Sequence, residues 1–128
     1  MKDVTAAYLA KAHQALDKAR RVFAIGLYDE AGRHAYYATF HAAQALLFER
    51  SDKVYATHQG VKAEFARRAK SDPRIERKHS AFLARAYSLK TAADYETGAA
   101  ATVSAAQVSE AISLADETVA VIERVAAE

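Results

Sequence analysis

Apolar side chains recur along the amino-terminal part of this chain at steps of three and four residues. This spacing places them on one face of an α-helix, the face that a folded protein buries against its neighbours. The repeat runs through Leu9, Ala12, Leu16, Ala19 and Phe23. It predicts a long first helix from about Asp3 to Ile25, and Gly26 supplies a stop signal.

A second helix is predicted to begin near Asp29 or Glu30, because acidic side chains are favourable at the positive end of the helix dipole. It runs to about Arg50. Its core seam consists of Tyr36, Phe40, Ala43 and Leu47. This helix is therefore expected to bury one side in the core and to carry polar groups beside it.

Three further helices are predicted by the same spacing and by their capping residues. A shorter one is capped by Thr57 and ends in the loop-like segment around Pro73. A fourth extends from about His79 to Glu96. The last begins at Ser104, with Gln107 at the spacing of a capping box.

The pattern contains no strand-like alternation of any length and no repeat at a fixed period. Short links between long amphipathic helices favour antiparallel neighbours. We therefore predict an all-α fold, an up-and-down antiparallel helical bundle of four main helices plus a short one. The length of 128 residues and a hydrophobic fraction of 52% suit a single domain over residues 1–128 with one buried core.

Charge and composition narrow the classes of function. The formal net charge of +2 is too small to predict nucleic-acid binding without a local basic patch. The absence of cysteine excludes disulfides, thiolate metal sites and a cysteine nucleophile. Charged residues interrupt the apolar ones near the amino-terminal end, so we expect neither a signal peptide nor a membrane span, and we expect a cytoplasmic location.

Two polar stripes carry the candidate chemistry. On the second predicted helix the stripe consists of Arg33, Tyr37 and His41, spaced four residues apart. On the fourth it consists of Tyr87, Lys90 and Asp94, with Tyr95 beside them. If these helices pack side by side, the stripes meet in a groove, where His41 and Lys90 are candidate catalytic groups or phosphate ligands. The other five residues are candidates for binding.

Each of these residues also has a purely structural interpretation. A lone histidine beside a core face is commonly a hydrogen-bonded structural group, and tyrosines at helical spacing usually fill a core. Lys90 and Asp94 are spaced as an ordinary ion pair on one helix. The histidines lack the spacing of metal ligands, so we predict no metal site and no cofactor. The basic segment from Arg67 to His79 is either a solvated surface or a contact for phosphates.

Three ordered blocks of the chain resemble the HEPN family. Residues 28–50 read YDEAGRHAYYATFHAAQALLFER, residues 57–69 read THQGVKAEFARRA, and residues 86–96 read AYSLKTAADYE. The first is similar to the signature helix of HEPN proteins, the second to a Thr-His-x-Gly-Val segment, and the third to a later helix ending in Ala-Asp-Tyr. The resemblance implies a bundle of about four or five helices, commonly a homodimer, with a role in RNA cleavage or nucleotide-related binding. It also implies a minimal nucleotidyltransferase as the partner in a toxin–antitoxin pair.

The chain departs from the pattern of active HEPN ribonucleases, which carry an arginine and, four to six residues later, a histidine on a late helix. At the matching position this chain has Lys90 followed by Tyr95, so the base is kept and the histidine is missing. A literal match, Arg74 with His79, lies in the proline-containing segment before the fourth predicted helix. The candidate catalytic pairs are therefore His41 with Lys90 and, as the alternative, Arg74 with His79.

The leading hypothesis is a HEPN-like domain, part of a two-component system of the toxin–antitoxin type, that binds a nucleotide or RNA. A metal-independent endoribonuclease that uses His41 with Lys90, or Arg74 with His79, is the alternative. A third hypothesis is a non-catalytic interaction module that docks a nucleotidyltransferase through its helical faces.

Overall fold

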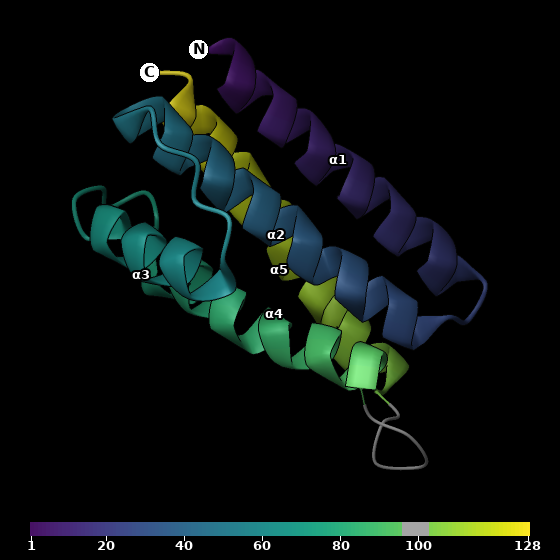
Figure 1. Ribbon diagram of the computed structural model, residues 1–128. Coiled ribbons are helices and arrows are strands. Elements are labelled where there is room, and N and C mark those ends of the chain that lie inside the picture. The colour runs from purple at the N-terminus through teal and green to yellow at the C-terminus, as the bar shows by residue number, and fades with distance from the viewer. Residues whose placement is uncertain (96–102) are drawn as a thin grey trace.

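The architecture is built from helices alone in the part of the chain that the computed structural model describes, residues 1–95 and 103–128, with only the backbone for Tyr95. The helices are α1 (Asp3–Ala24), α2 (Tyr28–Ser51), α3 (His58–Ala69), α4 (Arg77–Tyr95) and α5 (Ala105–Ala126). Figure 1 shows α1, α2 and α5 as long rods side by side, with α3 and α4 on the other side of α2. The predicted all-α bundle of four main helices and a short one is confirmed.

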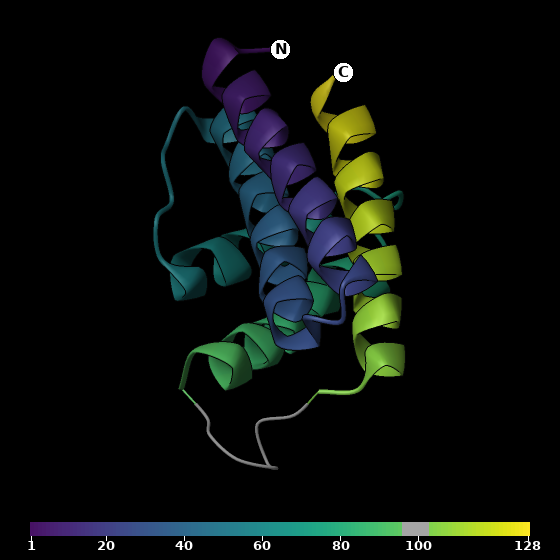
Figure 2. The same cartoon turned by 90° about the vertical axis from the view of Figure 1, so that its right-hand side faces the viewer.

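The link between α1 and α2 reverses the chain. Gly26 lies in this link with a φ of +82°, a left-handed conformation that glycine adopts without the steric cost of a Cβ atom. In Figure 2 both chain termini lie at the same end of the bundle, where α1 starts and where α2 and α5 finish. α1 is therefore antiparallel to both of its long neighbours, as the up-and-down prediction requires, whereas α2 and α5 run in the same direction.

The helix starts agree with the capping residues predicted from the sequence, with one shift. The Thr57 hydroxyl accepts a hydrogen bond from the backbone N–H of Gly60 at the start of α3. Ser104 and Gln107 form a complete capping box at the start of α5. The fourth helix begins at Arg77, two residues before its expected start, so His79 lies in the first turn of α4.

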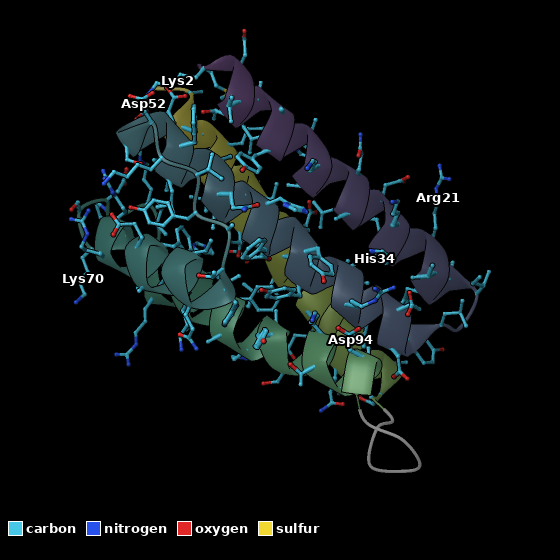
Figure 3. All side chains as sticks on the ribbon, in the orientation of Figure 1. Lys2, Arg21, His34, Asp52, Lys70 and Asp94 are labelled. Atoms are coloured by element: carbon cyan, nitrogen blue, oxygen red, sulfur yellow. The ribbon has the colours of Figure 1, made fainter. Side chains whose placement is uncertain are left out.

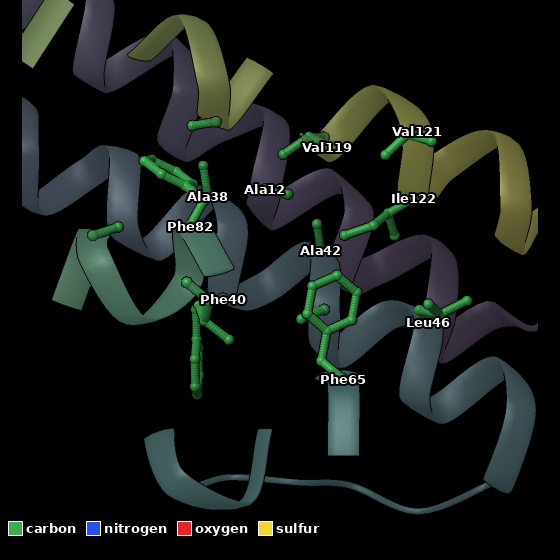
Figure 4. Packing of buried hydrophobic residues seen from close by; sticks show 14 of the residues in the cluster. Ala12, Ala38, Phe40, Ala42, Leu46, Phe65, Phe82, Val119, Val121 and Ile122 are labelled. Carbon is green, nitrogen blue, oxygen red and sulfur yellow. The ribbon is translucent and has the colours of Figure 1, made fainter. Parts of the chain in front are cut away.

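The hydrophobic core surrounds α2, which packs against each of the other four helices. Its predicted seam of Tyr36, Phe40, Ala43 and Leu47 is buried. Figure 4 shows Phe40 and Leu46 of α2 among Phe65, Phe82 and Ile122, which come from three other helices. α2 also buries alanines at 31, 35, 38, 42 and 45, so it is covered on more sides than the predicted seam alone would cover. None of the described helices combines the length and apolar composition needed to cross a bilayer.

Candidate functional site

The polar stripe of α2 is the part of that helix that the core leaves uncovered. Arg33, His34, Tyr37 and His41 are half-buried, whereas most of their neighbours on the helix are buried. The rings of Tyr37 and His41 stack with centroids 6.1 Å apart. The predicted stripe therefore exists as a surface, bounded by α1 on one side and by α4 on the other.

The stripes of α2 and α4 meet at one end, as the sequence predicted they would if the helices packed together. Nε of Arg33 lies 3.9 Å from Oδ1 of Asp94, and Nζ of Lys90 lies 2.7 Å from Oδ2 of the same carboxylate. Arg33 also donates a hydrogen bond to Glu30, and this bond is the main reason that the pKa of Arg33 is raised. The cations at this crossing are thus engaged by carboxylates, which joins the two helices.

An aromatic cluster lies next to that crossing. The ring of Tyr87 stacks on His58 of α3, with centroids 3.8 Å apart and ring planes 12° apart, and Tyr36 lies 5.5 Å from Tyr87. Nζ of Lys90 is 5.9 Å from the centre of the Tyr87 ring. The hydroxyl of Tyr36 is 2.9 Å from Nδ1 of His58, whose pKa is lowered mainly by burial. Sequence reasoning missed His58 because its partners lie on two other helices.

Tyr37 and His41 line a pocket on the other side of the stripe, between α1 and α2. The pocket has a volume of about 280 Å³. Its lining residues are Lys11, Gln14, Ala15, Lys18, His34, Tyr37 and His41. Figure 3 shows His34 on the side of α2 that faces α1, away from Asp94 at the end of α4. The groove was expected between the second and fourth helices, but the pocket of His41 is formed with the first helix.

The reason for this difference is the position of His41 along α2. His41 lies eight residues beyond Arg33, which is about 12 Å along the helix axis. The charged contacts described for Lys90 and Asp94 gather around Arg33, whereas the only polar contact described for His41 is with Gln44. The catalytic pairing of His41 with Lys90 therefore has no direct contact in the described part of the chain.

The electrostatics of the α1–α2 pocket favour an anion. None of the described residues that line it is acidic, and neither Lys11 nor Lys18 has an ion pair with a described carboxylate. Burial lowers the pKa of His41 and of His34, and the positive charge of Lys11 lowers that of His41 further. Near neutral pH the pocket therefore presents two ammonium groups beside two uncharged imidazoles.

The second candidate catalytic pair, Arg74 and His79, is arranged differently. His79 is only 2% exposed; its Nδ1 accepts a hydrogen bond from the N–H of Glu76, and its Nε2 lies 3.4 Å from Glu117. The guanidinium of Arg74 forms ion pairs with Asp72 and Glu128, each at 2.6 Å. The two side chains thus have separate partners, and a phosphate has little access to the imidazole.

Glu76, His79 and Glu117 place three ligand-type atoms within 4.8 Å of one another. Because Nδ1 of His79 accepts an N–H, its proton is on Nε2, the atom that faces Glu117. Glu117 is also held by Lys78, whose Nζ lies 2.6 Å from Oε1. A metal would have to displace both that proton and the ammonium, so this cluster is better explained as a polar junction between α4 and α5.

The side chain of Tyr95 lies outside the described residues, although its backbone ends α4. The residues that sequence reasoning missed in the pocket are Lys11, Gln14 and Lys18, together with His34. The first three follow one another at steps of three and four on α1, so a search for polar stripes on every helix would have found them.

Fold and site together define an all-α bundle with a cationic pocket between α1 and α2 and an aromatic cluster where α2, α3 and α4 meet. The family model described as the HEPN domain matches residues 5–125, nearly the whole chain. The chain therefore belongs to the HEPN family, and membership implies a function related to nucleotides or RNA. No curated protein matches the chain.

Proposed function

We propose that this HEPN domain binds a phosphate group of a nucleotide or of RNA in the α1–α2 pocket. The observation that carries this proposal is the meeting of Lys11 and Lys18 with the His34, Tyr37 and His41 side chains in a pocket without an acidic lining residue. Two ammonium groups that lack carboxylate partners attract an anion. Tyr37 and the imidazoles add aromatic and hydrogen-bonding surface of the kind that binds a nucleotide.

Binding of fluorescein-labelled single-stranded RNA, measured by fluorescence anisotropy at fixed salt, tests the proposal. We expect Lys11→Ala and Lys18→Ala each to weaken binding about 10-fold or more, because a hydrogen bond made by a charged group contributes about 1.5–3 kcal/mol. Lys70→Ala is the matched control, because Lys70 is an exposed lysine at the opposite end of the molecule from His34. If all three variants lose the same affinity for RNA, the loss comes from the general charge of the protein, and the assignment of the pocket is wrong.

Metal-independent ribonuclease activity is the second candidate function, and one observation favours it. His41 is uncharged near neutral pH and lies in the same pocket as two lysines, so a base and a cation for the phosphate are next to each other. RNA incubated with the protein in EDTA should be cleaved, and His41→Ala should abolish cleavage while His79→Ala leaves it intact if the variant folds. Cleavage that both variants retain would reject both catalytic pairs.

The assembly of the chain is also a proposal that rests on its family. We propose a homodimer that works in the cytoplasm beside a minimal nucleotidyltransferase, in a two-component system of the toxin–antitoxin type. Light scattering in solution should then give twice the chain mass of 13.9 kDa. Co-purification with a nucleotidyltransferase encoded by a neighbouring gene, without RNA binding by the HEPN chain, would instead favour the non-catalytic docking module.

A further inference from the structure

The hydrogen bonds of Gln44 determine which nitrogen of His41 carries the proton. Gln44 is nearly buried, and its Nε2 donates to the backbone carbonyl of Tyr55 at 2.7 Å. A carbonyl oxygen only accepts hydrogen bonds, so this contact identifies the nitrogen end of the amide. The oxygen end, Oε1, then lies 2.9 Å from Nδ1 of His41.

An amide oxygen also only accepts, so Nδ1 of His41 must donate and therefore carries the proton. Burial lowers the pKa of His41, which keeps the ring uncharged near neutral pH. In an uncharged imidazole with its proton on Nδ1, Nε2 has a free lone pair. Nε2 of His41 has no hydrogen-bond partner among the described residues. It is also not fully buried, because it is absent from the buried polar atoms that have no partner. It is therefore open to a ligand.

We infer that the α1–α2 pocket binds an anion that carries a hydroxyl group beside the phosphate, and that Gln44 is the positioning residue that turns the Nε2 lone pair of His41 toward this hydroxyl. The inference rests on the proposed binding of a phosphate by Lys11 and Lys18 and specifies its chemical class. A ribose phosphate has such a hydroxyl, whereas a deoxyribose phosphate lacks this hydrogen-bond donor. The pocket should therefore prefer ribonucleotides.

The contrast with His79 supports this assignment. In His79 the Nδ1 atom accepts from a backbone N–H, which leaves the proton on Nε2 facing Glu117. The two histidines thus have opposite tautomers because one faces an amide oxygen and the other a backbone N–H. His41, unlike His79, combines an acceptor nitrogen that has no described partner with a pocket that contains lysines.

The tautomer can be measured without a ligand. Long-range proton–nitrogen NMR spectra at pH 8 should show a protonated Nδ1 and an unprotonated Nε2 for His41. In Gln44→Met the acceptor is gone, and the signal should move to a mixture of tautomers. A His41 with its proton on Nε2 in the wild-type chain would overturn the inference whatever the variants do.

Selectivity is then tested with a short single-stranded oligouridylate and its 2′-fluoro counterpart, in which an acceptor of similar size replaces each 2′-hydroxyl. The wild-type chain should bind the ribo-oligonucleotide about two- to tenfold more tightly, the range of one hydrogen bond. The preference should disappear in His41→Ala and in Gln44→Met, with intact probe verified on a gel.

The possible outcomes separate this inference from the proposed function. Equal affinity for both probes, with binding still weakened by Lys11→Ala, overturns the hydroxyl contact and leaves the phosphate pocket standing. Binding of neither probe overturns both. A ribo-preference that survives in His41→Ala assigns the selectivity elsewhere and also overturns the inference.

Discussion

At the scale of single residues, the group that faces Nδ1 distinguishes His41, His58 and His79 from one another. Nδ1 of His41 faces an amide oxygen, that of His58 faces the Tyr36 hydroxyl, and that of His79 faces a backbone N–H. The sequence identified His41 as a candidate from its spacing on a helix. It could not indicate the tautomer, because the orientation of Gln44 depends on the carbonyl of Tyr55, which lies on a loop.

The histidines also predict how stability depends on pH. Burial lowers the pKa of His34, His41 and His58 in the folded chain below the ordinary value of 6.5. As the pH falls through that value, the unfolded chain takes up protons that the folded chain does not, so the free energy of unfolding decreases until the lowered values are passed. Urea unfolding at pH 7.5 and at pH 5.5 should therefore show a less stable protein at pH 5.5.

Carboxylates do not titrate in the range between pH 7.5 and pH 5.5. The pKa values of Glu64 and Asp72 are lowered to about 2 by arginine hydrogen bonds, so their stabilising effect is lost only below their ordinary values near pH 4. His41→Gln should reduce the stability difference between pH 7.5 and pH 5.5. The same stability at both pH values would show that the three half-buried imidazoles take up protons as readily as in the unfolded chain.

At the scale of helices, α2 explains both the success and the limits of the sequence prediction. Its seam was predicted from spacing and is buried, but alanines on its other sides are buried as well. Alanine is common on exposed and buried helix faces alike, so the sequence could not show how many neighbours α2 has. Without that information, the pocket could not be assigned to α1 in preference to α4.

Helix starts were predicted more reliably, because capping depends on a few consecutive residues. The Ser104 hydroxyl accepts from the N–H of Gln107, and Oε1 of Gln107 accepts from the N–H of Ser104. The start of α4 was placed two residues too late because Glu76, the residue before it, is not a preferred N-cap residue. The order and type of the five described helices could thus be predicted from local patterns alone.

The capping box gives a prediction for α5. Ser104→Ala removes the hydroxyl that satisfies a free N–H at the helix start, which should lower the free energy of unfolding by about 1 kcal/mol. Ser113→Ala is the control, because Ser113 is an exposed serine within the same helix and should change stability by less than about 0.5 kcal/mol. Urea denaturation of both variants checks this. Equal effects would mean that Ser104 contributes nothing as a cap.

At the scale of the whole molecule, the arrangement of charge is more informative than its sum. A net charge of +2 predicts little, because many basic side chains are paired with acids along the bundle. Arg20 pairs with Asp116, Lys78 with Glu117, and Arg74 with Glu128, so acidic side chains on α5 and just after it neutralise these cations. The α1–α2 pocket differs from these regions because its two lysines have no described carboxylate partner.

This difference predicts the salt dependence of RNA binding. Each lysine that contacts a phosphate of a single strand releases counterions, which contributes about 0.7 to the slope of log affinity against log salt concentration. The Lys11→Ala and Lys18→Ala double variant should therefore lower the slope by about 1.4. Lys70→Ala removes the same charge from an exposed position far from His34, and its slope should equal that of the wild-type chain. Contacts at a defined pocket make the slope depend on which lysine is removed. If each removed lysine, Lys70 included, lowers the slope by the same amount, RNA binds diffusely to the whole surface.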